Sequence, residues 1–144
     1  MLAPPEFSPG QWLACSAAVI GLLGALNLLY TFSGKKLRPR DTHLERQMNL
    51  VSPEISRHTT MWRAWVGFNA SHAIGALLFA SVYGYLGLRH AEFLFASRFL
   101  VLLGMAYLLA MAWLGKRYWF VVPFVGIVIS LALYGWAVWL AWWA

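Results

Sequence analysis

Four long apolar segments dominate the pattern of hydrophobic and polar positions along this chain. We expect them to form helices over about residues 12–32, 61–88, 93–114 and 118–143. About 20 helical residues rise about 30 Å, which matches the hydrocarbon core of a bilayer. The pattern therefore predicts an all-α integral membrane four-helix bundle, with residues 1–144 forming a single transmembrane domain.

Most connections between these segments are too short to hold another element. Residues 89–92 and 115–117 are expected to be tight turns, which would make the helices on either side antiparallel neighbours. The lead, residues 1–11, contains three prolines and is expected to be irregular. It lacks the basic start and the clear cleavage site of a secretory signal, so the first apolar segment is expected to remain in the mature protein.

Residues 33–60, the only long connection, carry helix signals of their own. Thr42-His43-Leu44-Glu45 fits a capping box, in which the threonine hydroxyl and the glutamate carboxylate accept from free backbone N–H groups at a helix start. Leu44, Met48 and Val51 then recur at i, i+4 and i+7. This spacing predicts a short amphipathic interfacial helix that lies along the lipid headgroups.

Two prolines mark expected helix starts. Ser52 can cap the second membrane helix with Pro53 at its first position, where the missing N–H is not needed. That helix would then begin in water, ahead of its apolar part. Pro123 falls in the first turn of the last helix, where a proline costs little.

The composition supports a membrane class. Hydrophobic residues make up 61% of the chain and charged residues 11%, whereas soluble domains carry about 25% charged residues. The net charge of +6 alone would be compatible with nucleic-acid binding. The basic residues, however, flank the apolar segments, where they meet anionic lipid headgroups. We therefore expect membrane lipids as partners and no nucleic acid.

The basic residues also predict an orientation. Nine of the eleven Lys and Arg residues lie in residues 33–63 and 115–117, and only Arg89 and Arg98 lie on the other side. Basic residues accumulate on the cytoplasmic side of membrane proteins. We therefore expect a multi-pass protein of a bacterial inner (plasma) membrane with both termini outside and the long connection in the cytoplasm.

A few polar residues interrupt the apolar segments at similar expected depths. Depths counted at about 1.5 Å per residue along the helices, from the outer end for the first three helices, place these residues in one layer in the cytoplasmic half of the bundle. The members of this predicted polar layer are Asn27, Asn69, His72, Tyr107 and Ser130. His72 is the only histidine that must lie within a span, and an ionisable side chain there is costly unless a partner satisfies it.

This layer has a structural and a functional interpretation. As structure, hydrogen bonds between amide, imidazole and phenol groups would hold the helices in one register, at about 0.6 kcal/mol each. In the functional interpretation, the layer would bind a ligand, with His72 as the catalytic candidate, or it would contact another chain. A cavity beside His72 would favour the functional interpretation, and a closely packed ring would favour the structural one.

Several cofactor classes are disfavoured by the residues present. Cys15 is the only cysteine, which excludes an intrachain disulfide and a Cys-x-x-Cys pair. A haem with two axial histidine ligands needs histidines on facing helices, but His43, His58 and His90 fall in loops or at membrane interfaces. A proton-coupled exporter needs a carboxylate inside the membrane, and Glu92 lies at a turn. We expect no metal and no cofactor.

Small residues on the first helix predict a helix contact. Ala17, Gly21 and Ala25 recur every four residues, which lets another helix approach closely within the bundle or from a second copy.

The run Trp65-Val66-Gly67-Phe68-Asn69-Ala70-Ser71-His72-Ala73-Ile74-Gly75 carries a resemblance to a known family. Together with Ser52-Pro53-Glu54-Ile55-Ser56 before it and Tyr118-Trp119-Phe120 with Pro123 after it, this run resembles an uncharacterised family of small bacterial four-helix membrane proteins. The likeness covers about residues 48–134. It implies the four-helix membrane fold and draws attention to Asn69 and His72, but it implies no reaction.

Two functions follow as hypotheses. The first is a binding or accessory module that forms a homo-oligomer through its small-residue faces or joins a larger membrane complex. The alternative is a membrane enzyme that acts on a lipid or another hydrophobic substrate, with His72 as acid–base and Asn69 orienting it.

Overall fold

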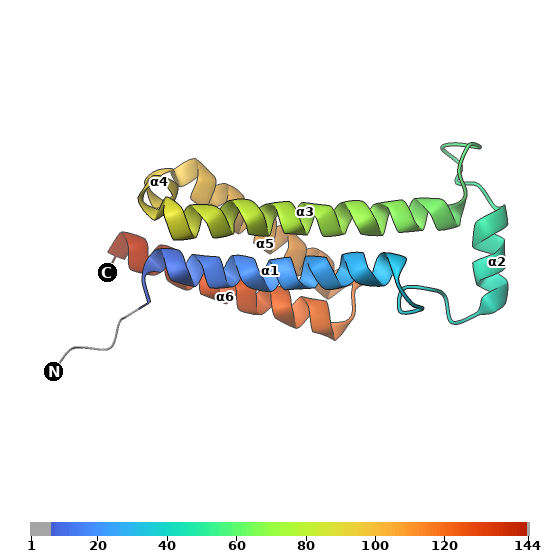
Figure 1. Cartoon of the computed structure of the whole chain (residues 1–144), viewed down its shortest axis with the longest axis horizontal. Helices are drawn as coiled ribbons and strands as arrows, with labels where there is room; N and C mark the ends of the chain where they lie inside the picture. The colour runs from blue at the N-terminus through green and yellow to red at the C-terminus, as the bar shows by residue number, and fades with distance from the viewer. Residues whose placement is uncertain (1–6, 144) are drawn as a thin grey trace. The chain divides into compact units, whose positions relative to one another are not determined.

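The computed structural model describes residues 7–143, and every regular element within them is a helix. In chain order the elements are α1 (Pro9–Phe32), α2 (Thr42–Leu50), α3 (Met61–Arg89), α4 (Ala91–Ala96), α5 (Arg98–Tyr118) and α6 (Val121–Trp143) (Figure 1). Four of them, α1, α3, α5 and α6, are long and apolar enough to cross a membrane. The all-α fold and its four long apolar helices are therefore confirmed.

The start of α1 corrects the expectation of an irregular lead. The helix begins at Pro9 because Ser8 and Gln11 form a reciprocal cap. The Ser8 N–H donates to Gln11 Oε1 at 2.8 Å, and the Gln11 N–H donates to Ser8 Oγ at 3.3 Å. This is a capping box with glutamine in place of glutamate, and Pro9 takes the first helical position, where its missing N–H is harmless. Residues 1–6 lie outside the described range.

The short helix α2 forms where the sequence predicts it, but its cap differs. Asp41, not Thr42, is the N-cap residue, and its Oδ1 accepts from the His43 N–H at 2.8 Å. Glu45 is paired with Arg38, 3.2 Å away, instead of reaching back to the helix start. The capping box at Thr42 is therefore wrong, since a carboxylate one residue earlier caps the helix and a nearby cation binds the glutamate.

The start of α3 is Met61, as the apolar segment predicts, and the start at Ser52 and Pro53 is wrong. Residues 51–60 form no regular element. The Met61 N–H donates to the Val51 carbonyl at 2.8 Å, which closes this stretch into a loop. Thr60 caps the helix, because its Oγ1 accepts from the Arg63 N–H at 3.3 Å.

The third long helix also begins later than expected. Residues 91–96 form the separate helix α4, and α5 starts at Arg98 because Ser97 caps it, with Oγ accepting from the Leu100 N–H at 3.3 Å. The helix then continues through residues 115–117, which were expected to be a turn, and ends at Tyr118. Pro123 lies in the first turn of α6, as predicted.

The described chain divides into two compact units. The first contains residues 7–23 and 76–143, so it combines the start of α1, the end of α3, and α4 to α6. Its core includes Leu13, Phe79, Leu108, Ile127 and Tyr134. The second unit, residues 24–75, contains the rest of α1, the long connection with α2, and the start of α3.

Within the first unit, α1 and α3 approach closely along small residues. The Cβ positions of Gly10 and Gly87 would each run into the backbone of the other helix. About three turns further along α1, a Cβ on Gly21 would lie 3.1 Å from the Cβ of Ala80. Gly21 therefore packs against another helix as the stripe predicts. Ala25 is exposed, so within the chain the contact runs from Gly21 towards Gly10 instead.

Candidate functional site

The five residues of the predicted polar layer fall in both units. Asn27, Asn69 and His72 belong to the second unit, and Tyr107 and Ser130 belong to the first. His72 is half-buried, three residues after Asn69 on α3, so the two share a helix face. A layer that joins all five residues stays a prediction, and each unit shows its own polar contacts.

Ser130 forms a reciprocal pair with Ser16 between α6 and α1. Both serines are fully buried, at 0% exposure. Ser16 Oγ lies 2.8 Å from both the carbonyl oxygen and the hydroxyl of Ser130, and Ser130 Oγ donates to the Ser16 carbonyl at 3.0 Å. Each hydroxyl is thus satisfied by the opposite helix, and the pair holds the two helices in one register. The sequence singles out Ser130 but not Ser16.

Tyr107 belongs to a column of stacked aromatic rings. Its ring lies 4.5 Å from that of Phe79, and Phe79 in turn lies 4.5 Å from Tyr83. Tyr134 continues the column, with its ring centroid 6.1 Å from that of Tyr83. Stacked pairs at these distances stabilise beyond the area they bury. Tyr107 therefore contributes its ring to the packing of α3 against α5.

Two tyrosines of this column donate hydrogen bonds to the first turn of α5. Tyr83 donates to the Leu100 carbonyl at 2.7 Å, and Tyr134 donates to the Val101 carbonyl at 3.0 Å. The rings reach these carbonyls only because residue 104 is glycine. A Cβ at Gly104 would collide with the Tyr134 hydroxyl and would lie 2.6 Å from Cε1 of Tyr83. Gly104 thus forms a notch that the sequence pattern did not reveal.

Each of the two asparagines of the second unit has a polar contact within its own helix. Thr31 Oγ1 donates to the Asn27 carbonyl at 2.8 Å and lies 3.3 Å from Asn27 Oδ1. The Asn69 amide donates to the Trp65 carbonyl at 2.9 Å. Each contact spans four residues of one helix, since the Thr31 hydroxyl reaches back to residue 27 and the Asn69 amide reaches back to residue 65.

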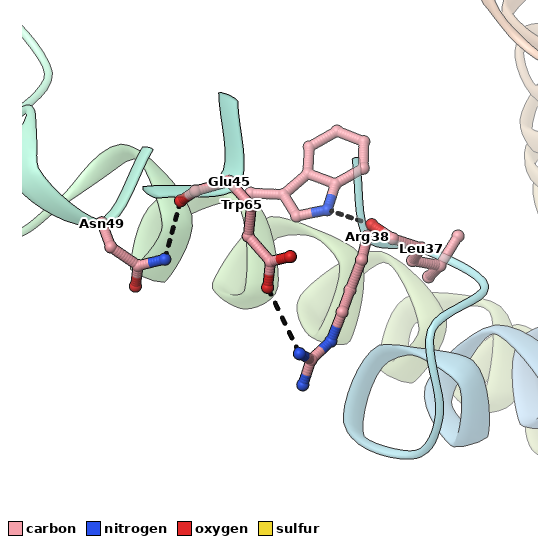
Figure 2. A network of polar contacts seen from close by, with 5 residues as sticks. All are labelled: Leu37, Arg38, Glu45, Asn49 and Trp65. Carbon is pink, nitrogen blue, oxygen red and sulfur yellow. Dashed lines mark hydrogen bonds and ion pairs between the residues drawn. The ribbon is translucent and has the colours of Figure 1, made fainter. Parts of the chain in front are cut away.

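The long connection is fastened to the start of α3 by a tryptophan. Figure 2 shows the Trp65 indole pointing at the chain just after α1, where its Nε1 donates to the Leu37 carbonyl at 3.1 Å. The neighbouring Arg38 pairs with Glu45 of α2 at 3.2 Å, and its guanidinium lies 5.9 Å from the Trp62 ring. These contacts connect the chain that follows α1 with α2 and with the start of α3.

A small pocket of about 30 Å³ lies beside these contacts. That volume is about the size of one water molecule. Its lining combines a cation, aromatic rings and an amide, and is made of Tyr30, Thr31, Phe32, Gly34, Leu37, Arg38, Trp62, Trp65, Val66 and Asn69. Asn69 is the one residue of the predicted polar layer in this lining. Positive φ at Gly34 (82°) lets the chain turn away from α1 at the pocket edge.

No family model, curated protein or solved structure matches this chain. Within residues 7–143, no three His, Cys, Asp or Glu side chains are grouped so as to hold a metal ion. The resemblance of residues 65–75 to a family of small membrane proteins therefore stays a prediction.

Proposed function

We propose that this chain is a small multi-pass membrane protein that acts as a binding or accessory module and associates with a second copy through α3. The four long apolar helices support membrane insertion. Large apolar side chains are exposed along all four, including Leu22, Phe68, Leu102 and Val128, as expected for surfaces that face lipid. Association is supported by one observation, an open small-residue face on α3.

That open face consists of Gly67, Ser71 and Gly75, spaced four residues apart and all exposed. Within residues 7–143, a Cβ added at either glycine would have no neighbour within 4 Å. Phe68 and Ile74, which flank the stripe, are exposed as well. Small residues at this spacing let two membrane helices approach closely and gain packing on the flanking side chains.

The small residues of α1 from Gly10 to Gly21 differ, because α3 already packs against them. Gly10 and Gly21 face Gly87 and Ala80 of α3 inside the first unit. The Ser71 hydroxyl donates to the Phe68 carbonyl of its own helix at 3.0 Å, so Ser71 can enter an apolar contact without losing a hydrogen bond. The α3 face is therefore better suited to a second chain than the α1 stripe.

The test is a double substitution, Gly67→Leu with Gly75→Leu. We expect it to convert an oligomer to a monomer, because two leucines would hold the partner helix away. Mass in mild detergent by light scattering and subunit counting by photobleaching in bilayers would measure this. Gly135→Leu on α6, which is also next to open space, is the matched control and should leave the mass unchanged. An unchanged mass for the double variant would remove this face from any interface.

For the orientation, we propose that both termini lie outside a bacterial inner membrane. Two variants would test this orientation, both with Cys15→Ala. One carries Ser33→Cys and the other Arg89→Cys, so that each has a single cysteine, and the two positions lie at opposite ends of the candidate spans. An impermeant thiol reagent on intact cells should label the cysteine at position 89 and spare the one at position 33. Most basic residues lie at the same end as position 33, so that end should be in the cytoplasm, where the reagent does not reach. Labelling of position 33 alone would invert the orientation.

A further inference from the structure

The connection between α1 and α3 exposes several large apolar side chains. Helix α2 has no buried residue, and Leu44 and Leu50 are exposed. Just after it, Val51 is exposed and Ile55 is 94% exposed. Side chains of this kind gain free energy when they leave water, in proportion to the apolar area removed.

The same connection is basic. Residues 33–60 hold six Lys or Arg residues and three acidic residues, a formal net charge of +3. Two of the acidic side chains are already engaged, since Asp41 caps α2 and Glu45 pairs with Arg38. Arg40 and Arg57, which lie just before α2 and just after Ile55, are exposed. Cations that flank exposed apolar side chains complement an anionic lipid surface.

The connection follows α1 directly and is also hydrogen-bonded to the start of α3. Trp65 is hydrogen-bonded to Leu37 on one side, and Met61 is hydrogen-bonded to Val51 on the other. Figure 1 shows α2 running across the adjoining ends of α1 and α3 within the second unit. A segment held at the ends of two membrane spans lies at the level of the headgroups, where an apolar phase and lipid phosphates are both within reach.

We propose that α2 and residues 51–55 form a docking surface for the anionic phospholipids of the bilayer. Leu44, Val51 and Ile55 enter the acyl boundary, and Arg40 and Arg57 bind lipid phosphates. Around α2, at about 100° per residue, Asn49 lies on the side away from Leu44 and faces water. This inference rests on the membrane placement proposed above, and it is independent of association through α3.

In the test, a single nitroxide label is attached to a cysteine introduced at position 44 or at position 49 of the full chain. Cys15→Ala removes the native cysteine so that only the introduced one is labelled. The protein is inserted into vesicles of phosphatidylcholine, alone or mixed with phosphatidylglycerol, and insertion is verified by flotation before labels are compared. We expect the label at position 44 to collide mainly with oxygen and the label at position 49 mainly with a water-soluble nickel chelate. Phosphatidylglycerol should move the label at position 44 deeper.

A double variant, Arg40→Gln with Arg57→Gln, separates the charge contribution from the apolar one. Because each cation near an anionic surface changes partitioning roughly fivefold, this variant should lose most of the effect of phosphatidylglycerol. Equal nickel access at positions 44 and 49 in floated vesicles would overturn the docking surface. A depth independent of phosphatidylglycerol would overturn the recognition of anionic lipid. Failure of flotation would instead contradict the membrane placement itself.

Discussion

Gly104→Ala is expected to be among the most destabilising single-methyl substitutions in this protein. The new Cβ would collide with the Tyr134 hydroxyl and would lie 2.6 Å from the Tyr83 ring. Both tyrosines would have to withdraw, and their hydroxyls would leave the carbonyls of Leu100 and Val101. Overpacking costs about 1–3 kcal/mol, and a buried hydroxyl without a partner costs about 1–3 kcal/mol more. Thermal unfolding in mild detergent would measure the loss.

Two comparisons make this prediction specific. Gly135→Ala, next to open space on α6, should be neutral or slightly stabilising, because alanine favours a helix more than glycine does. Tyr134→Phe removes the colliding oxygen, so it should cost less in the Gly104→Ala protein than in the native one. The contact with Tyr83 would remain, and the rescue should therefore be partial. If the effects of the two substitutions on stability were additive, the collision between a Cβ at position 104 and the Tyr134 hydroxyl would be contradicted.

Gly87→Ala is expected to separate α1 from α3 in the first unit. Its Cβ would lie 2.7 Å from the Gly10 carbonyl oxygen and 3.4 Å from the backbone nitrogen of Ala14. Backbone atoms cannot rotate away as a side chain does, so the helices themselves must move. We expect a loss of about 1–3 kcal/mol, visible as a lower midpoint of thermal unfolding in detergent.

Gly84→Ala, one turn away on α3, is the matched control for Gly87→Ala. Its Cβ would lie 3.7 Å from that of Ala17, an ordinary van der Waals distance. This substitution should therefore preserve or slightly raise the unfolding midpoint, since it adds a contact and improves helix propensity. Equal losses at positions 84 and 87 would show that the separation of α1 and α3 at this end is not limited by the glycine backbones.

Helix ends were less predictable than helix positions. Two of the wrong boundaries involve a choice between possible capping residues, Asp41 or Thr42 for α2 and Ser52 or Thr60 for α3. Any of these side chains can accept from a free N–H, so residue type alone does not choose between them. The tertiary contacts choose, because the ion pair of Glu45 with Arg38 leaves the cap of α2 to Asp41.

The predicted polar residues were partly informative about the site. Ser130 does hold two helices together, but its partner Ser16 lies 114 positions away, and no local pattern links them. Asn69 does line a pocket, but the cation beside it comes from Arg38 of the long connection, which the pattern of polar positions did not link to Asn69. Sequence periodicity therefore found polar positions without finding their partners.

The sequence by itself determined the helical class and the four long apolar helices, because the length of an apolar run and its lack of charge decide whether a helix can cross a bilayer. It also located α2, since spacing along one helix is local information. Only the tertiary structure decided that Ser16 meets Ser130, that two tyrosines occupy the notch at Gly104, and that Gly10 faces Gly87. These contacts depend on which faces of distant helices meet, and an apolar helix with no strongly polar side does not encode that choice in its periodicity.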